Sequence, residues 1–126
     1  MEEFRRQGPR IDVEALCWEV LDTGETSAIA VDLSQGGIRI ERPFVGGRTP
    51  KVVPLQLDVP GIDEIMWARG EACFDHVVQV KGTLMRRTGY RIAIAASRER
   101  RMIREYVYDM HRTRRMLAED FASFTA

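Results

Sequence analysis

The sequence predicts a mainly β fold, a small β-barrel followed by one long C-terminal α-helix. Between residues 11 and 96, short apolar segments recur at regular spacing and are separated by turns that contain glycine or proline, a pattern typical of small barrels. From Arg98 to Phe124 the chain has neither glycine nor proline, which favours a helix. A chain of 126 residues fits one domain and can bury a core without disulfides or a metal.

The apolar segments place the expected strands, which we assign to residues 11–21, 27–33, 38–41, 52–59, 65–74, 77–86 and 89–96. Both faces of the first segment are partly apolar, which predicts a bulge or a strong twist in that strand. The fifth and sixth segments read as a pair. Turns are expected at 22–25, 34–37 and 46–47, and the adjacent Gly36 and Gly37 indicate either positive φ or a close approach of the backbone to another group.

The final segment is amphipathic, with an apolar stripe that repeats every seven residues at Ile103, Met110, Leu117 and Phe124. Ser97 is placed to cap this helix. The stripe is interpreted as a packing surface, either for the barrel or for a partner protein. The chain therefore divides into a flexible arginine-rich arm (residues 1–10), the barrel (residues 11–97) and the amphipathic helix (residues 98–126).

The charge of the chain favours a compact anionic ligand over a long polyanion. Lysine plus arginine and aspartate plus glutamate both number 19, so the formal net charge is zero, which argues against a DNA- or RNA-binding barrel. All of the basic residues except Lys51 and Lys81 are arginine. The forked guanidinium pairs with phosphate or with a guanine edge and stacks on flat rings.

Several functional classes find no support in the sequence. Cys17 and Cys73 are not spaced as a metal motif and are interpreted as small buried apolar residues, so we expect neither a metal nor a cofactor. No Ser-His-Asp arrangement or paired carboxylate set can be placed, and we expect no enzyme. The first residues are polar and no stretch approaches the length of a membrane span, which predicts a cytoplasmic protein that does not insert into membranes.

Two short segments together indicate a ligand site. The first is Arg6-Gln7-Gly8-Pro9-Arg10, an arginine arm that precedes the first expected strand. The second is Asp32-Leu33-Ser34-Gln35-Gly36-Gly37, a turn between the second and third expected strands. Each has a plain alternative. The arm can be a solvated terminus, and the turn side chains can bond to their own backbone. The order and placement of the two segments make the functional interpretation the stronger one.

This pair of segments resembles the signature of the PilZ family, RxxxR followed by [D/N]xSxxG. The resemblance covers residues 5–96, and Gln7 and Gly8 depart from the residues that the family often has there. It implies a six-stranded antiparallel PilZ-type β-barrel that binds the bacterial second messenger cyclic di-GMP. The ligand-binding residues that it implies are Arg5, Arg6, Arg10, Asp32, Ser34, Gly36 and Gly37.

The chemistry of these residues suits the implied ligand, which has two phosphates and two guanines. Arginine donates two hydrogen bonds to guanine O6 and N7 or clamps a phosphate. Asp32 can accept hydrogen bonds from guanine N1–H and N2–H₂, and the Ser34 hydroxyl can contact phosphate or base. The two glycines leave room and expose backbone N–H groups. Arg5 is interpreted first as a surface charge, and its alternative role is to stack on an outer guanine.

The leading hypothesis is therefore a receptor and adaptor in second-messenger signalling that controls motility or biofilm formation. Ligand binding would change the conformation of the arm and the surface, and the final helix would transmit this to an effector protein. The alternative is a PilZ-like interaction module that works without nucleotide in pilus or motility assembly. The receptor is favoured because the motif residues Arg6, Arg10, Asp32, Ser34 and Gly36 are all intact.

Overall fold

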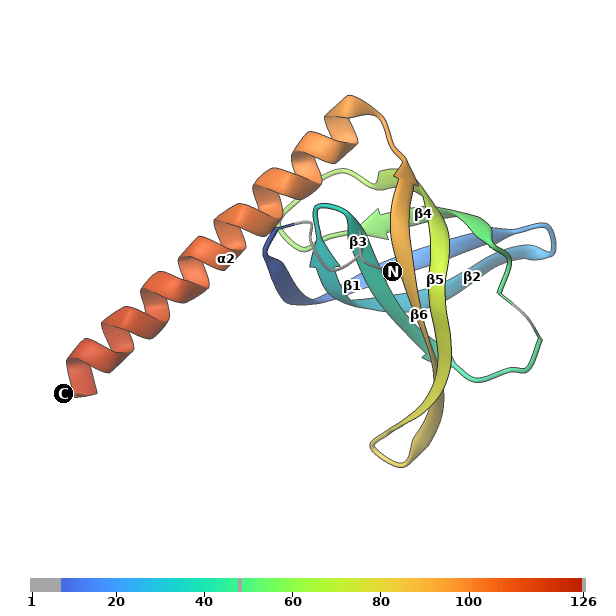
Figure 1. Cartoon of the computed structure of the whole chain (residues 1–126), viewed down its shortest axis with the longest axis horizontal. Helices are drawn as coiled ribbons and strands as arrows, with labels where there is room; N and C mark the ends of the chain where they lie inside the picture. Colours follow the sequence, from blue (N-terminus) through green and yellow to red (C-terminus); the bar gives the residue numbers. More distant parts are fainter. Residues whose placement is uncertain (1–7, 48, 126) are drawn as a thin grey trace.

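The computed structural model describes residues 8–47 and 49–125, with the backbone alone for Phe121 and residues 123–125. Within these residues, six antiparallel strands close into a barrel in the order β1-β2-β3-β6-β5-β4. A single helix follows the barrel (Figure 1). The strands are β1 (Arg10–Leu21), β2 (Gly24–Ser34), β3 (Gly37–Pro43), β4 (Val52–Asp58), β5 (Met66–Val80) and β6 (Thr83–Ile94), and the helix is α2 (Ser97–Thr125).

The bulge expected in the first strand is confirmed. The β1–β2 ladder pairs Asp12 with Asp32 and then resumes at Ala15 with Ala30, so its register shifts between these two pairs. A bulge bends a strand and increases its twist, and β1 uses both effects. It pairs with β2 along most of its length and also with β4 from Leu16 to Glu19. The bend therefore helps β1 to close the barrel.

The boundaries expected for the last strands were wrong. Two strands, β5 and β6, take the place of the three segments expected over 65–96, and the hairpin turns at Lys81 and Gly82. Both turn residues have positive φ, 51° and 81°, as a tight two-residue hairpin turn requires. The polar residues between the expected segments were taken for breaks. They belong to a ribbon of β5 and β6 that extends beyond the barrel (Figure 1).

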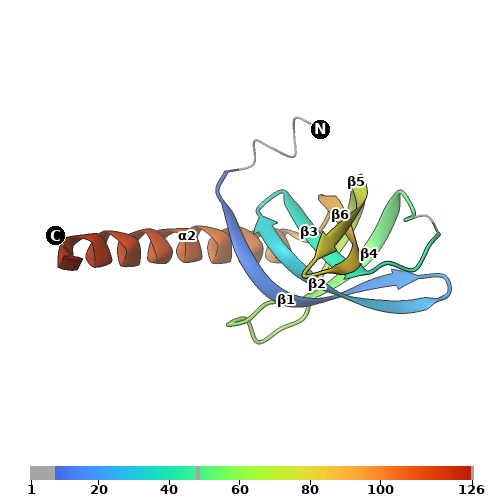
Figure 2. The ribbon, with the colours of Figure 1, turned by 90° about the horizontal axis from the view of Figure 1, so that it is seen from below.

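The helix α2 packs on the barrel with its first half only. Ile103 and Val107 are buried in the core cluster, and Met110 is partly buried against it. Every described side chain from His111 to Asp120 is exposed, and Leu117 has 62% of its surface exposed. Figure 2 shows this half extending past the barrel. The apolar stripe thus packs on the barrel in the first half of the helix and is exposed in the second half.

A polar group lies inside the otherwise apolar barrel. Glu19 and Tyr90 are almost fully buried, and the Tyr90 hydroxyl donates a hydrogen bond to the Glu19 carboxylate. Arg42 Nη1 lies 3.2 Å from Glu19 Oε1 and also 3.2 Å from Thr88 Oγ1. Since a buried carboxylate is stable only when it is paired and hydrogen-bonded, this network links strands β1, β3 and β6 through side chains.

Candidate functional site

The two segments that the sequence singled out meet at one rim of the barrel. Arg10 is the first residue of β1 and pairs in register with Ser34, the last residue of β2. The turn that joins β2 to β3 follows directly. Because antiparallel pairing brings the start of one strand beside the end of the next, the end of the arginine arm and the Asp32–Gly37 turn form one surface.

Asp32 lies between two guanidinium groups. Its Oδ1 is 3.4 Å from Arg10 Nε, and its Oδ2 is 3.7 Å from Arg39 Nη2. The residue is 8% exposed, and burial raises the pKa of the Asp32 carboxyl above its ordinary value, an effect that Arg10 and Arg39 partly offset. The site therefore holds a partly desolvated carboxylate and two cationic groups, which is a surface able to recognise a ligand with both donors and negative charge.

Arg39 was missed by the sequence analysis. It belongs to β3 and stands opposite Asp32 in the β2–β3 ladder. The signal was available, because Asp32 and Arg39 flank the expected turn symmetrically and a hairpin pairs such positions across its strands. The Arg39 Nε is buried and has no hydrogen-bond partner in the part of the chain that the structure describes. The Arg39 guanidinium is therefore held at the site by its ion pair with Asp32 rather than by a hydrogen bond from Nε.

Ser34 shapes the turn. Its hydroxyl accepts a hydrogen bond from the Gly37 backbone N–H at 3.1 Å, so the plain interpretation of this side chain, a bond to its own backbone, holds in the structure. Neither Gly36 nor Gly37 is among the glycines with positive φ, so of the two reasons expected for these glycines only a close approach of the backbone to another group remains. The Gly36 carbonyl accepts a hydrogen bond from Ile92 N at 2.9 Å, which ties the turn to β6.

The arm reaches the helix before it enters the barrel. Gly8 has φ +83°, and a Cβ built on it would lie 2.7 Å from the Tyr108 hydroxyl oxygen of α2. The close approach and the left-handed backbone both account for glycine at this position. Arg5 and Arg6, also expected in the site, lie outside the described residues.

The described part of the chain also bears on the expectations about metal binding, membrane spans and the two cysteines. It contains no group of three or more His, Cys, Asp or Glu side chains that could hold a metal ion. No helix in residues 8–47 and 49–125 is long and apolar enough to cross a membrane. Cys17 is fully buried as expected, and burial raises the pKa of its thiol to about 12. Cys73 is only half-buried, so its assignment to the interior was wrong.

Comparison by sequence finds no match to a protein-family model or to a curated protein. Comparison by structure finds several similar proteins. The Bacillus subtilis inhibitor of motility, MotI/DgrA, aligns with a TM-score of 0.74 over 88% of this chain at 15% identity. The PilZ domain of YcgR from Escherichia coli, solved with c-di-GMP, aligns at 0.67 over 91% of this chain at 16% identity. The PlzA protein of Borreliella burgdorferi in complex with c-di-GMP aligns at 0.65 over 90% at 7% identity.

These likenesses confirm the expected fold, a six-stranded antiparallel PilZ-type barrel with a long C-terminal helix. The chain spans 98% of the isolated PilZ domain of YcgR, but only about half of the longer proteins, 53% of MotI and 55% of PlzA. This chain therefore corresponds to only a part of the longer proteins.

Proposed function

We propose that this chain is a receptor for cyclic di-GMP, which binds at the barrel rim where Asp32 lies between Arg10 and Arg39. That arrangement is the observation that carries the proposal. It combines a carboxylate with two guanidinium groups beside the β2–β3 turn. Two of the structurally similar proteins, the YcgR PilZ domain and PlzA, were solved with c-di-GMP, which supports the same ligand class here.

Each side of the ligand has a matching group at this rim. Guanine N1–H and N2–H₂ donate hydrogen bonds and need an acceptor, which the Asp32 carboxylate provides. Guanine O6 and N7, and the phosphate oxygens, are acceptors that suit the forked donors of Arg10 and Arg39. We assign Arg6 to the same clamp, and Arg5 to the stacking of an outer guanine. Ser34 acts mainly by holding the turn in shape.

We further propose that the chain works as an adaptor rather than as an enzyme. The arm touches α2 at Tyr108, so a ligand that draws the arm over the rim changes the surface beside the helix. The exposed half of α2 is the surface that we assign to an effector protein. Motility is a process that such an effector could serve, since MotI is an inhibitor of motility.

The direct test is calorimetric titration of the purified chain with cyclic di-GMP, with cyclic di-AMP as the matched control. Adenine lacks the N1–H and N2–H₂ donors that the Asp32 carboxylate is proposed to accept. The expected result is saturable binding of cyclic di-GMP and much weaker binding of cyclic di-AMP, with this preference reduced in Asp32→Ala. Equal affinity for the two ligands would remove the proposed role of Asp32. No binding of cyclic di-GMP would favour the nucleotide-independent interaction module.

A further inference from the structure

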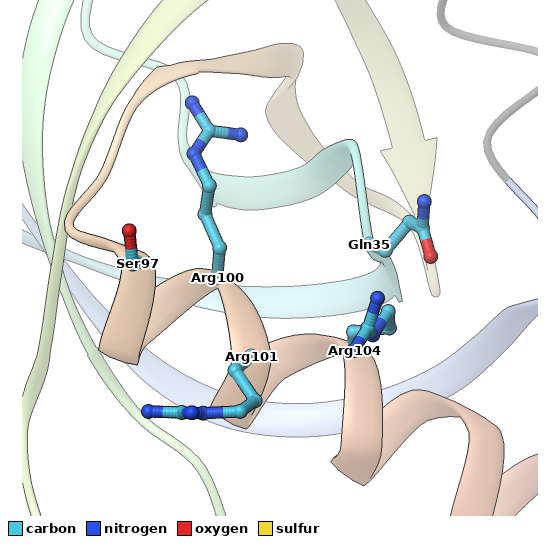
Figure 3. A pocket seen from close by; sticks show the side chains of 5 residues that line it. All are labelled: Gln35, Ser97, Arg100, Arg101 and Arg104. Carbon is cyan, nitrogen blue, oxygen red and sulfur yellow. The ribbon is translucent and has the colours of Figure 1, made fainter.

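A pocket of about 320 Å³ lies between the β2–β3 turn and the first two turns of α2. Its lining residues are Gln35, Ser97, Arg100, Arg101 and Arg104, shown in Figure 3. The volume is at the lower end of the range found for small-molecule sites. In Figure 3 the Arg104 side chain extends toward Gln35, and Arg100 and Arg101 stand on the helix turn before it. The sequence analysis assigned this helix to packing and to the transmission of the signal to an effector protein, and did not include it in the ligand site.

The pocket adjoins the candidate site. Gln35 directly follows Ser34, so one wall of the pocket is the turn that carries the Asp32–Gly37 segment. On the other wall, residues three and four positions apart share one face of a helix. Arg101, Arg104 and Tyr108 therefore lie in line along α2. Tyr108, which Gly8 approaches, lies further along the same face, while the pocket itself lies between the turn and the helix.

The charges in the pocket are not balanced by the protein. Arg101 and Arg104 are exposed, and neither forms an ion pair or hydrogen bond within the described residues. Arg100 donates hydrogen bonds to the backbone carbonyls of Ala93 and Ala95, which holds its guanidinium at the end of β6 without neutralising it. Cations near the start of a helix also act against its dipole, which favours anions there. This cluster is thus suited to a negatively charged group.

We propose that Arg101 and Arg104 of α2 form the second wall of the ligand site and bind a phosphate of the cyclic dinucleotide held at the rim. This inference rests on the proposed function, because it assigns the helix to the same ligand. The guanine lies at Asp32 and Arg10, and the phosphate reaches across the Gln35 turn to the helix. Ligand binding would then join the barrel rim to α2 directly, in addition to its effect through the arm.

The test measures the affinity for cyclic di-GMP by calorimetry in five variants of the whole chain: Arg104→Ala, Arg101→Ala, Arg104→Lys, Arg10→Ala and Arg114→Ala. Arg114 is the matched control, because it is an exposed arginine of the same helix outside the pocket and has no partner in the described part of the chain. We expect Arg104→Ala and Arg101→Ala each to raise Kd about tenfold, as the loss of a charged hydrogen bond would. Arg104→Lys should lose less, because it keeps the charge but not the fork.

The outcomes separate this inference from the proposed function. Loss of affinity in Arg104→Ala and Arg10→Ala, with Arg114→Ala unchanged, supports both. Loss in Arg10→Ala alone, with Arg104→Ala and Arg101→Ala equal to the control, overturns the role of the helix and leaves the receptor in place. Equal losses in Arg104→Ala and Arg114→Ala also overturn it, since that pattern reports only the overall charge of the helix. If the wild-type chain binds no cyclic di-GMP, both proposals fall. Thermal unfolding of each variant without ligand checks that the fold is intact.

Discussion

Arg10 and Asp32 are tied together at the barrel rim, with Arg10 Nε 3.4 Å from Asp32 Oδ1. Arg10 is the first residue of β1, and Asp32 is two residues before the end of β2. The pair therefore joins the end of the arm to the turn that follows β2. A guanidinium in this position offsets the charge of the buried carboxylate, and in the proposed site it also presents donors to the ligand. These two roles lead to different predictions.

The first prediction concerns affinity. Arg10→Ala, and separately Arg6→Ala, should weaken binding of cyclic di-GMP by about ten- to more than a hundredfold, because each removes a charged hydrogen bond to the ligand. The free energy of unfolding should change by less than about 1 kcal/mol for Arg10→Ala, since its ion pair is partly exposed. Calorimetry and urea unfolding measure the two quantities. Unchanged affinity in both variants would move the site elsewhere.

The second prediction concerns pH and follows from the buried Asp32. Burial raises the pKa of its carboxyl, so the folded chain holds this proton to a higher pH than the unfolded chain does. The contribution of Asp32 to stability therefore falls as the pH rises through the interval between its ordinary and its raised pKa. A ligand that donates hydrogen bonds to the carboxylate favours the ionised form and acts in the opposite direction.

Affinity for cyclic di-GMP should accordingly fall as the pH is lowered from about 7 toward about 4. The matched variant is Asp32→Asn, which has no such proton to lose. Its affinity should be weaker than that of the wild type at neutral pH and nearly constant over the same interval. Titrations at several pH values measure both. A wild-type affinity that does not depend on pH, or the same dependence in both proteins, would contradict the assignment.

The parts of the molecule that the sequence revealed are those that depend on local pattern. Alternating apolar residues gave the first four strands and the bulge in β1, and the two motif segments placed Arg10, Asp32 and Ser34 at one rim. Features that arise from contacts between distant residues could not be read in this way. The approach of Gly8 to Tyr108 joins the arm to a helix about a hundred residues away. Nothing in the seven-residue repeat marked where the barrel would end and leave Leu117 uncovered.

The third prediction tests the polar network inside the barrel. Tyr90→Phe removes the hydroxyl that donates to the buried Glu19 carboxylate, which leaves that carboxylate with Arg42 alone among its described partners. The free energy of unfolding should fall by about 1–3 kcal/mol, the usual cost of a buried polar group that loses a partner. Tyr106→Phe is the control, because Tyr106 is only partly buried and has no hydrogen bond within the described residues. Urea unfolding measures the free energy of unfolding of both variants, provided that its dependence on urea concentration keeps the slope of the wild type. Equal losses of stability in Tyr90→Phe and Tyr106→Phe would count against the network.

The last prediction concerns the contact between the arm and the helix. Gly8→Ala places a methyl group against the Tyr108 hydroxyl and forces a left-handed backbone on alanine, which costs on the order of 1–2 kcal/mol. The arm should leave its position beside α2, and the affinity for cyclic di-GMP should fall several-fold with little change in overall stability. Gly47→Ala measures the stability cost of the left-handed backbone without the clash. Gly47 has nearly the same φ, +84°, and nothing lies within 4 Å of the added Cβ.

A double-mutant cycle isolates the contact itself. In a Tyr108→Ala background the clash is gone and only the backbone strain remains, so Gly8→Ala should there reduce affinity less than it does in the wild type. Calorimetry on the four proteins gives the coupling between the two positions. If Gly8→Ala weakens binding equally in both backgrounds, the arm does not act through Tyr108, and the link between ligand and helix must run through the Gln35 turn instead.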